Sequence, residues 1–99
     1  MTSPRLSHSA ALILKALSLG YCFGLDVMEV TGLPSGTVYP ALRRLERAGH
    51  VESEWSTVNG RERRTYRLTG SGHRALAATQ RYPLLARLVS SRVIQEKRS

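Results

Sequence analysis

The chain has 99 residues, of which 41% are hydrophobic, and it carries 15 Lys and Arg against 7 Asp and Glu. This composition suits one small packed domain and excludes a wholly disordered chain. The single cysteine excludes an internal disulfide framework, and the lack of a Cys/His cluster argues against a structural zinc module. The longest apolar run, residues 10–14, is far shorter than the ~20 residues of a membrane span. With no signal-peptide pattern at its start, the chain is expected to be soluble and cytoplasmic, with no membrane partner.

The net charge is +8, and 13 of the 15 basic residues are arginine. Such an excess of positive charge favours a polyanionic partner such as nucleic acid, ahead of an anionic membrane surface or an acidic protein. The preference for arginine points the same way, because the planar guanidinium matches phosphate groups and guanine edges. Charge alone leaves open that these side chains only solvate the surface.

The N-terminal part is predicted to hold a flexible tail and a helix. Residues 1–7 form the tail. Ser7 or Ser9 is a suitable cap for a first helix that runs to about Leu19. Gly20 then ends this helix, as glycine commonly does just past a helix terminus.

Two further helices are predicted next. The first is short and spans about residues 25–30. Residues 31–34, Thr-Gly-Leu-Pro, break it within four positions. Ser35 is predicted to cap a longer helix over about residues 36–48, which ends at Gly49. Its inward face is predicted to carry Val38, Ala41, Leu42 and Leu45.

A β-hairpin is predicted after these helices, because the apolar pattern changes to a period of two. Residues 51–57 alternate, residues 59–60 are Asn-Gly, and a return strand covers about residues 63–68. In the first strand, Val51, Ser53, Trp55 and Thr57 are predicted to share one face. In the return strand, Arg64, Tyr66 and Leu68 are predicted to share one face.

The C-terminal region is predicted to be helical, with Thr69 as its cap and either a kink or a break at Pro83. It carries an apolar set that a lone subunit would leave exposed and that two subunits would bury together. The predicted dimerisation residues are Leu76, Tyr82, Leu85, Leu88 and Val89.

The order of these elements is typical of a winged helix-turn-helix, in which the β-hairpin forms the wing. The fold class is mainly α with a small β hairpin (α+β), and the winged helix-turn-helix is followed by a C-terminal dimerisation helix. The predicted organisation is a flexible tail over residues 1–7, a DNA-binding domain over residues 8–69 and a dimerisation region over residues 70–99.

The outward face of the third helix and the wing tip carry the candidate DNA contacts. Small residues near the helix start allow close approach to a major groove, and a helix N-terminus favours phosphate. Arginines on a hairpin suit contact with the backbone or the minor groove. Arg64 shares a strand face with apolar residues and has an inward position as its alternative. The candidate residues are Ser35, Gly36, Thr37, Tyr39, Pro40, Arg43, Arg44, Arg47, Arg61, Arg63 and Arg64.

Four side chains have alternative interpretations. Trp55 and Tyr66 are expected to pack the wing onto the helices, with ligand stacking as the alternative. Tyr39 is suited either to packing or to a phosphate contact. Cys22 is expected to be a small buried thiol, with redox sensing as the alternative.

No enzyme site is evident in the sequence. The three histidines, His8, His50 and His73, lie at no metal-ligand spacing, and the Gly-Ser-Gly at residues 70–72 lacks the lysine of a P-loop. We therefore expect no cofactor, no metal and no catalytic residue.

Several segments together resemble the PadR family of bacterial transcription regulators. Residues 36–46 read Gly-Thr-Val-Tyr-Pro-Ala-Leu-Arg-Arg-Leu-Glu, and the Gly-Thr-x-Tyr-Pro-x-Leu-x-x-Leu-Glu pattern in them is specific. The likeness covers about residues 11–78. Further matching positions are residues 48–55, Gly60, Arg61, residues 64–69 and Gly72. The chain departs from the family at Phe23 and Leu25, where the family usually has His and Tyr, in its short second helix and in its short C-terminal region.

The resemblance implies a winged-helix domain that binds double-stranded DNA and a C-terminal helix that pairs two subunits. It also implies a homodimeric repressor, often responsive to a small-molecule effector of phenolic or drug-like chemistry. The main alternative is a winged-helix module that binds an acidic protein partner. An RNA-binding protein ranks lower, because Tyr39 is the one aromatic side chain expected to be exposed for stacking.

Overall fold

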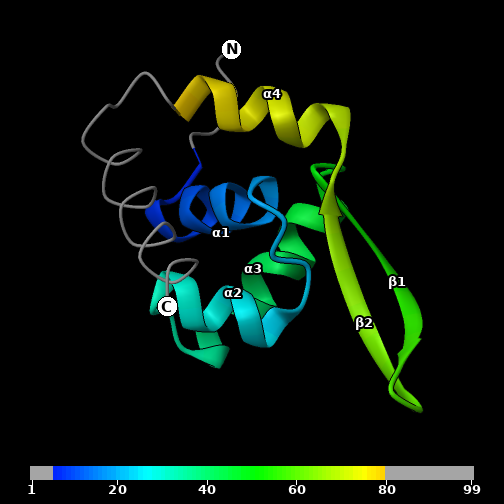
Figure 1. Cartoon of the computed structure of the whole chain (residues 1–99). Helices are drawn as coiled ribbons and strands as arrows, with labels where there is room; N and C mark the ends of the chain where they lie inside the picture. Colours follow the sequence, from blue (N-terminus) through cyan, green and yellow to red (C-terminus); the bar gives the residue numbers. More distant parts are fainter. Residues whose placement is uncertain (1–5, 80–99) are drawn as a thin grey trace.

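The computed structural model describes residues 6–79. These residues fold into a group of helices from which a β-hairpin projects (Figure 1). The chain order of helix, short helix, helix, hairpin and helix agrees with the sequence prediction. The elements are α1 (His8–Ser18), α2 (Gly24–Thr31), α3 (Ser35–Arg47), β1 (Val51–Val58), β2 (Arg61–Leu68) and α4 (Gly70–Thr79).

The ends of α1 follow the predicted local chemistry. The Ser7 hydroxyl accepts a hydrogen bond from the backbone N–H of Ala10 at 3.1 Å, so Ser7 is the cap. At the other end Gly20 has φ +101°, a conformation that L side chains rarely adopt. Both predictions for this helix are therefore confirmed.

The turn between α2 and α3 corrects one capping prediction. Gly32, at φ +75°, ends α2. The carbonyl of Pro34 accepts hydrogen bonds from the N–H groups of Thr37 and Val38, so Pro34 occupies the cap position of α3. Ser35 is already the first helical residue, and the prediction that it caps α3 is wrong. The extended backbone of Pro34 supplies the first acceptor of the helix without a side-chain cap.

The core lies between α1, α3 and the base of the hairpin. Ile13 and Leu14 of α1 are fully buried, as are Val38 and Leu42 of α3. α1 also packs against α2 and α4, and α4 runs alongside it in Figure 1. None of the helices within residues 6–79 is long and apolar enough to cross a membrane.

Leu76 differs from the sequence prediction. Its side chain is only 7% exposed and belongs to the core of the single chain. The expectation that a lone subunit leaves Leu76 exposed is therefore wrong, because α4 packs against α1 and buries this residue within the chain. The other predicted dimerisation residues, Tyr82, Leu85, Leu88 and Val89, and the predicted break at Pro83 lie outside the described residues.

The hairpin forms as predicted and is slightly longer on its return strand. Asn59 and Gly60 have φ +53° and +77°, which are the signs that a two-residue type I′ turn requires. This tight turn lets pairing begin at once between Val58 and Arg61, so β2 starts two residues before the predicted position 63.

The connection between α1 and α2 adds a short third segment to the sheet. Phe23 pairs with Thr65 on the free edge of β2, and the N–H of Tyr66 donates to the carbonyl of Cys22 at 2.8 Å. The sequence predicts only a tight connection here. The pairing attaches the hairpin to the start of α2 through the backbone.

Thr69 joins the end of α3 to the start of α4. Its hydroxyl accepts a hydrogen bond from the N–H of Gly72 at 3.0 Å, so the predicted cap is confirmed. The same hydroxyl donates to the carbonyl of Gly49 at 2.6 Å. Nearby, a ring nitrogen of His50 lies 2.7 Å from the Ser71 hydroxyl. These contacts hold the start of α4 against Gly49 and His50, the residues just past the end of α3.

The close approach at Gly72 generates a stability prediction. Gly72→Ala should lower the free energy of unfolding by about 2–3 kcal/mol, because the added methyl group would overlap the carbonyl oxygen of His50. Gly70→Ala is the matched control, since a methyl group there meets only the end of the Arg74 side chain at 3.5 Å. Urea denaturation followed by circular dichroism measures both. Equal midpoints for the two variants would contradict this account.

Candidate DNA-binding surface

The two faces of α3 have opposite character. The predicted inward residues are all buried, so this part of the prediction is confirmed. The opposite side of the helix carries Arg43, Arg44 and Arg47, all exposed. The core contact therefore fixes the rotation of α3 and turns a set of guanidinium groups towards solvent. The buried residues are Val38, Ala41, Leu42 and Leu45.

The start of α3 presents small residues. Ser35 and Gly36 are exposed, and a methyl group added at Gly36 would meet nothing within 4 Å. Thr37 and Pro40 are half-buried. Because Pro40 lacks an N–H, it donates no hydrogen bond to the helical turn before it. This end of the helix offers backbone polar groups with little side-chain bulk over them.

The three candidate arginines of the wing have three different settings. Arg61 is exposed next to the hairpin turn. The guanidinium of Arg63 lies over the Phe23 ring, 4.2 Å from its centroid. Arg64 lies closer to the helices and interacts with α3. The sequence analysis groups these side chains at the wing tip, with an inward position as the alternative for Arg64, and the structure separates them along β2.

A polar contact ties the wing to α3. The Ser53 hydroxyl donates to Oε2 of Glu46 at 2.7 Å, and Nε of Arg64 donates to the Ser53 hydroxyl at 3.0 Å. A second guanidinium nitrogen of Arg64 lies 3.6 Å from the same carboxylate oxygen. The sequence analysis missed Glu46 and Ser53, and the only available signal was their place on the faces that α3 and β1 present to each other. We call Glu46, Ser53 and Arg64 the wing–helix tie.

Trp55 and Tyr66 do not behave as a pair. Tyr66 is 9% exposed and packs into the core, where burial raises the pKa of its phenol. Trp55 is 63% exposed, so the prediction that it packs the wing onto the helices is wrong. The indole meets Arg64, whose guanidinium lies 5.5 Å from the ring centroid. The expectation that Tyr39 is the one exposed aromatic side chain is also wrong, because Trp55 is exposed and Tyr39 is half-buried.

Tyr39 lies against the beginning of α2. A methyl group on Gly24 would come within 2.6–2.8 Å of the Tyr39 ring and hydroxyl, so the glycine is needed for this close packing. Tyr39 is itself half-buried. The structure thus shows the packing role that the sequence analysis left open. Cys22, in the preceding connection, is half-buried, which is more exposed than the expected buried thiol.

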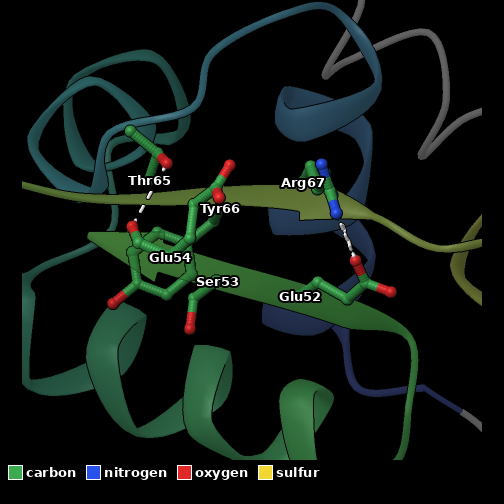
Figure 2. Close-up of a pocket in the computed structure, with 6 residues that line it drawn as sticks. All are labelled: Glu52, Ser53, Glu54, Thr65, Tyr66 and Arg67. Carbon is green, nitrogen blue, oxygen red and sulfur yellow. Dashed lines mark hydrogen bonds and ion pairs between the residues drawn. The ribbon is translucent and has the colours of Figure 1, made fainter. Parts of the chain in front are cut away.

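The other face of the hairpin carries mixed charges. In Figure 2, Ser53 and Tyr66 point to one side of the sheet, and Glu54 and Thr65 point to the other. Nε and Nη2 of Arg67 both donate to Oε2 of Glu52, the closer contact being 2.7 Å. This interaction raises the pKa of the Arg67 guanidinium. Arg67 is therefore paired on this outer face, away from the tie.

Residues 6–79 contain no group of three or more His, Cys, Asp and Glu side chains that could hold a metal ion. The concentration of functional groups in this part of the chain lies instead on α3 and the wing.

A helix-turn-helix with an arginine-bearing second helix, followed by a hairpin, defines a winged helix-turn-helix. The sequence model of the transcriptional regulator PadR-like family matches residues 13–78. The chain therefore belongs to the PadR-like family of transcriptional regulators, as its motifs indicate.

Individual relatives agree with this assignment. The transcriptional regulator Rv3488 of Mycobacterium tuberculosis is 50% identical over 46 residues, which span 46% of this chain and 43% of that protein. A PadR family transcription regulator from Clostridium difficile R20291 is 25% identical, with a TM-score of 0.71 over 86% of this chain and 97% of its own. The structure of smu.1704 from Streptococcus mutans UA159 shares the fold, with 24% identity and a TM-score of 0.72 over 95% of this chain and 94% of its own.

The wing–helix tie generates the second stability prediction. Ser53→Ala should lower the free energy of unfolding by about 1 kcal/mol, because it removes the hydroxyl that bridges Glu46 and Arg64. Ser56→Ala is the matched control, since Ser56 lies on the same strand with its side chain on the opposite face. Thermal and urea unfolding measure the difference. A loss of the same size in both variants would show that the bridge contributes nothing of its own.

Proposed function

We propose that this regulator binds double-stranded DNA in a sequence-specific manner, as a homodimeric repressor on a palindromic operator. The observation that carries the proposal is the arginine face of α3, which is exposed opposite the core and lies beside an arginine-bearing wing. A helix of this kind enters the major groove, and a wing contacts the neighbouring backbone or minor groove. Repression would follow from occupation of a promoter.

The roles of the α3 residues follow from their positions. Arg43 and Thr37 are assigned to base or near-base contacts, because a guanidinium matches the two major-groove acceptors of guanine. Gly36 and Pro40 allow the backbone of α3 to approach the groove. The phosphate contacts on α3 are assigned to Ser35, Tyr39, Arg44 and Arg47.

The wing arginines divide between contact and positioning. Arg61 and Arg63 are assigned to the DNA backbone, where they contribute affinity more than specificity. Arg64 is held by Glu46 and Ser53, which supports a role in setting the angle between the wing and α3. A small-molecule effector remains an expectation drawn from the family resemblance.

The dimer is proposed from the apolar pattern of the C-terminal region. Two-fold symmetry would place two α3 helices about 34 Å apart, one turn of DNA, on two inverted half-sites. Tyr82, Leu85, Leu88 and Val89 are the proposed contacts between subunits, whereas Leu76 is already buried within its own chain.

A second candidate is a protein that binds single-stranded nucleic acid. Exposed aromatic side chains are the feature such proteins use for base stacking, and Trp55 is 63% exposed beside Arg64. A module for an acidic protein partner is the third candidate, since exposed arginines alone are compatible with it.

Selection of bound sequences from a random duplex pool tests the proposal. We expect enrichment of two inverted half-sites whose centres lie about one helical turn apart, since a two-fold dimer reads the same sequence twice. The selected duplex should compete better than its separated strands or the matching RNA. Enrichment of a single unrepeated site would contradict the symmetric dimer. Failure of any duplex to bind would contradict the function itself.

Arg43 and Arg44 should differ in what they recognise. Arg43→Ala should cost about 1–3 kcal/mol on the selected site and relax the preference at one position of each half-site. Arg44→Ala, its matched control with the same loss of charge, should weaken all sequences by a similar factor. Titration of a panel of single-base operator variants measures both. If Arg43→Ala keeps the wild-type ranking of the panel, base recognition falls to Thr37 and the small residues beside it.

A further inference from the structure

A hollow of about 280 Å³ lies between the wing and the beginnings of α2 and α3. Its walls carry aromatic rings from three parts of the chain: Phe23 before α2, Tyr39 of α3, and Trp55 of the wing. Leu25, also in the wall, is 58% exposed. Large apolar side chains thus remain in water at a place where the fold brings three elements together.

The hollow also carries positive charge. The guanidinium of Arg63 stacks on Phe23, and that of Arg64 lies 5.5 Å from the centroid of Trp55. Glu62 is the only carboxylate among the residues that line the hollow. Rings next to guanidinium groups suit a ligand with an apolar surface and negatively charged oxygens.

We propose that this hollow receives one sugar–phosphate strand of duplex DNA, with Trp55 as a direct contact. The proposal rests on the proposed function, because it takes α3 and the wing as the two elements that engage adjacent grooves. A strand that separates those grooves has to pass between α3 and the wing, where the hollow lies. Deoxyribose offers an apolar face to the indole, and the indole N–H is a donor for phosphate oxygen.

The wing–helix tie presents Trp55 in a defined position. Arg64 contacts the indole and is itself held by Ser53 and Glu46 of the tie. An indole has only two rotatable bonds, so little conformational freedom is lost when it binds. The exposed indole is therefore preorganised for a partner, and the negative charge of DNA complements Arg64 beside it and Arg63 in the same hollow.

Trp55 is the only tryptophan in the chain, so its fluorescence reports on this place alone. The experiment uses the full chain and a random-sequence duplex at low salt, with binding measured independently by anisotropy of a labelled duplex. At saturation, quenching of Trp55 by acrylamide should fall at least about twofold, because the bound strand excludes the quencher from this exposed side chain. Unchanged quenching on a saturated duplex would overturn the proposal and leave the proposed function intact.

Variants test whether the contact contributes to affinity. Trp55→Ala should weaken duplex binding about fivefold through lost apolar contact, and Trp55→Phe should recover most of that loss. Unfolding curves check that the fold is retained, which we expect because the indole is exposed. Arg64→Ala should weaken binding more than Arg67→Ala, the matched loss of one charge on the outer face. Wild-type affinity in Trp55→Ala would overturn the proposal.

The two remaining outcomes are also decisive. If single-stranded DNA or RNA protects Trp55 more strongly than duplex does, the hollow stacks bases and the proposal is overturned. If no duplex binds at all by anisotropy, the proposed function fails and this inference fails with it. The anisotropy and quenching measurements therefore distinguish failure of the contact from failure of the function.

Discussion

The burial of one face of α3 is the constraint on which the rest of this structure depends. Val38 and Leu42 have no exposed surface, and burial of such side chains stabilises a fold by about 1.5–3 kcal/mol each. Because successive residues turn by about 100° around a helix, this contact also fixes the direction of every other side chain on α3. Arg43 and Arg47 face solvent as a direct consequence. The same packing that stabilises the domain thereby orients its candidate recognition surface.

The wing depends on α3 and α2 in a comparable way. The backbone of Cys22 pairs with Tyr66, which fixes the base of the hairpin beside the start of α2. The wing–helix tie then fixes the hairpin against the last turns of α3. Nearer the turn the strands are paired mainly with each other, and Thr57, Arg61 and Glu62 are exposed. The position of the wing arginines therefore follows from contacts made nearer to the core.

These attachments give neighbouring residues different chemical roles. Arg61, Arg63 and Arg64 are of one type within four positions, yet one is exposed beside the turn, one stacks on Phe23 and one joins the tie. The exposed indole of Trp55 lies beside Arg64. A basic hairpin of this kind combines a free charge, a stacked charge and a positioned aromatic ring, rather than a uniform positive patch.

Local rules were sufficient for the element order, a serine cap on α1 at Ser7 or Ser9, the Asn-Gly turn and the buried face of α3. Each depends on residues within about one or two turns of one another, so the sequence by itself determined them. Only the tertiary structure decided that Trp55 is exposed, that Leu76 is buried within its own chain, and that Glu46 meets Ser53. Trp55 and Tyr66 lie on one face of the hairpin, but contacts with the rest of the fold decide that Tyr66 packs into the core and Trp55 is exposed. Those contacts, like the position of α4 on α1, are made between segments remote in sequence, which no local pattern encodes.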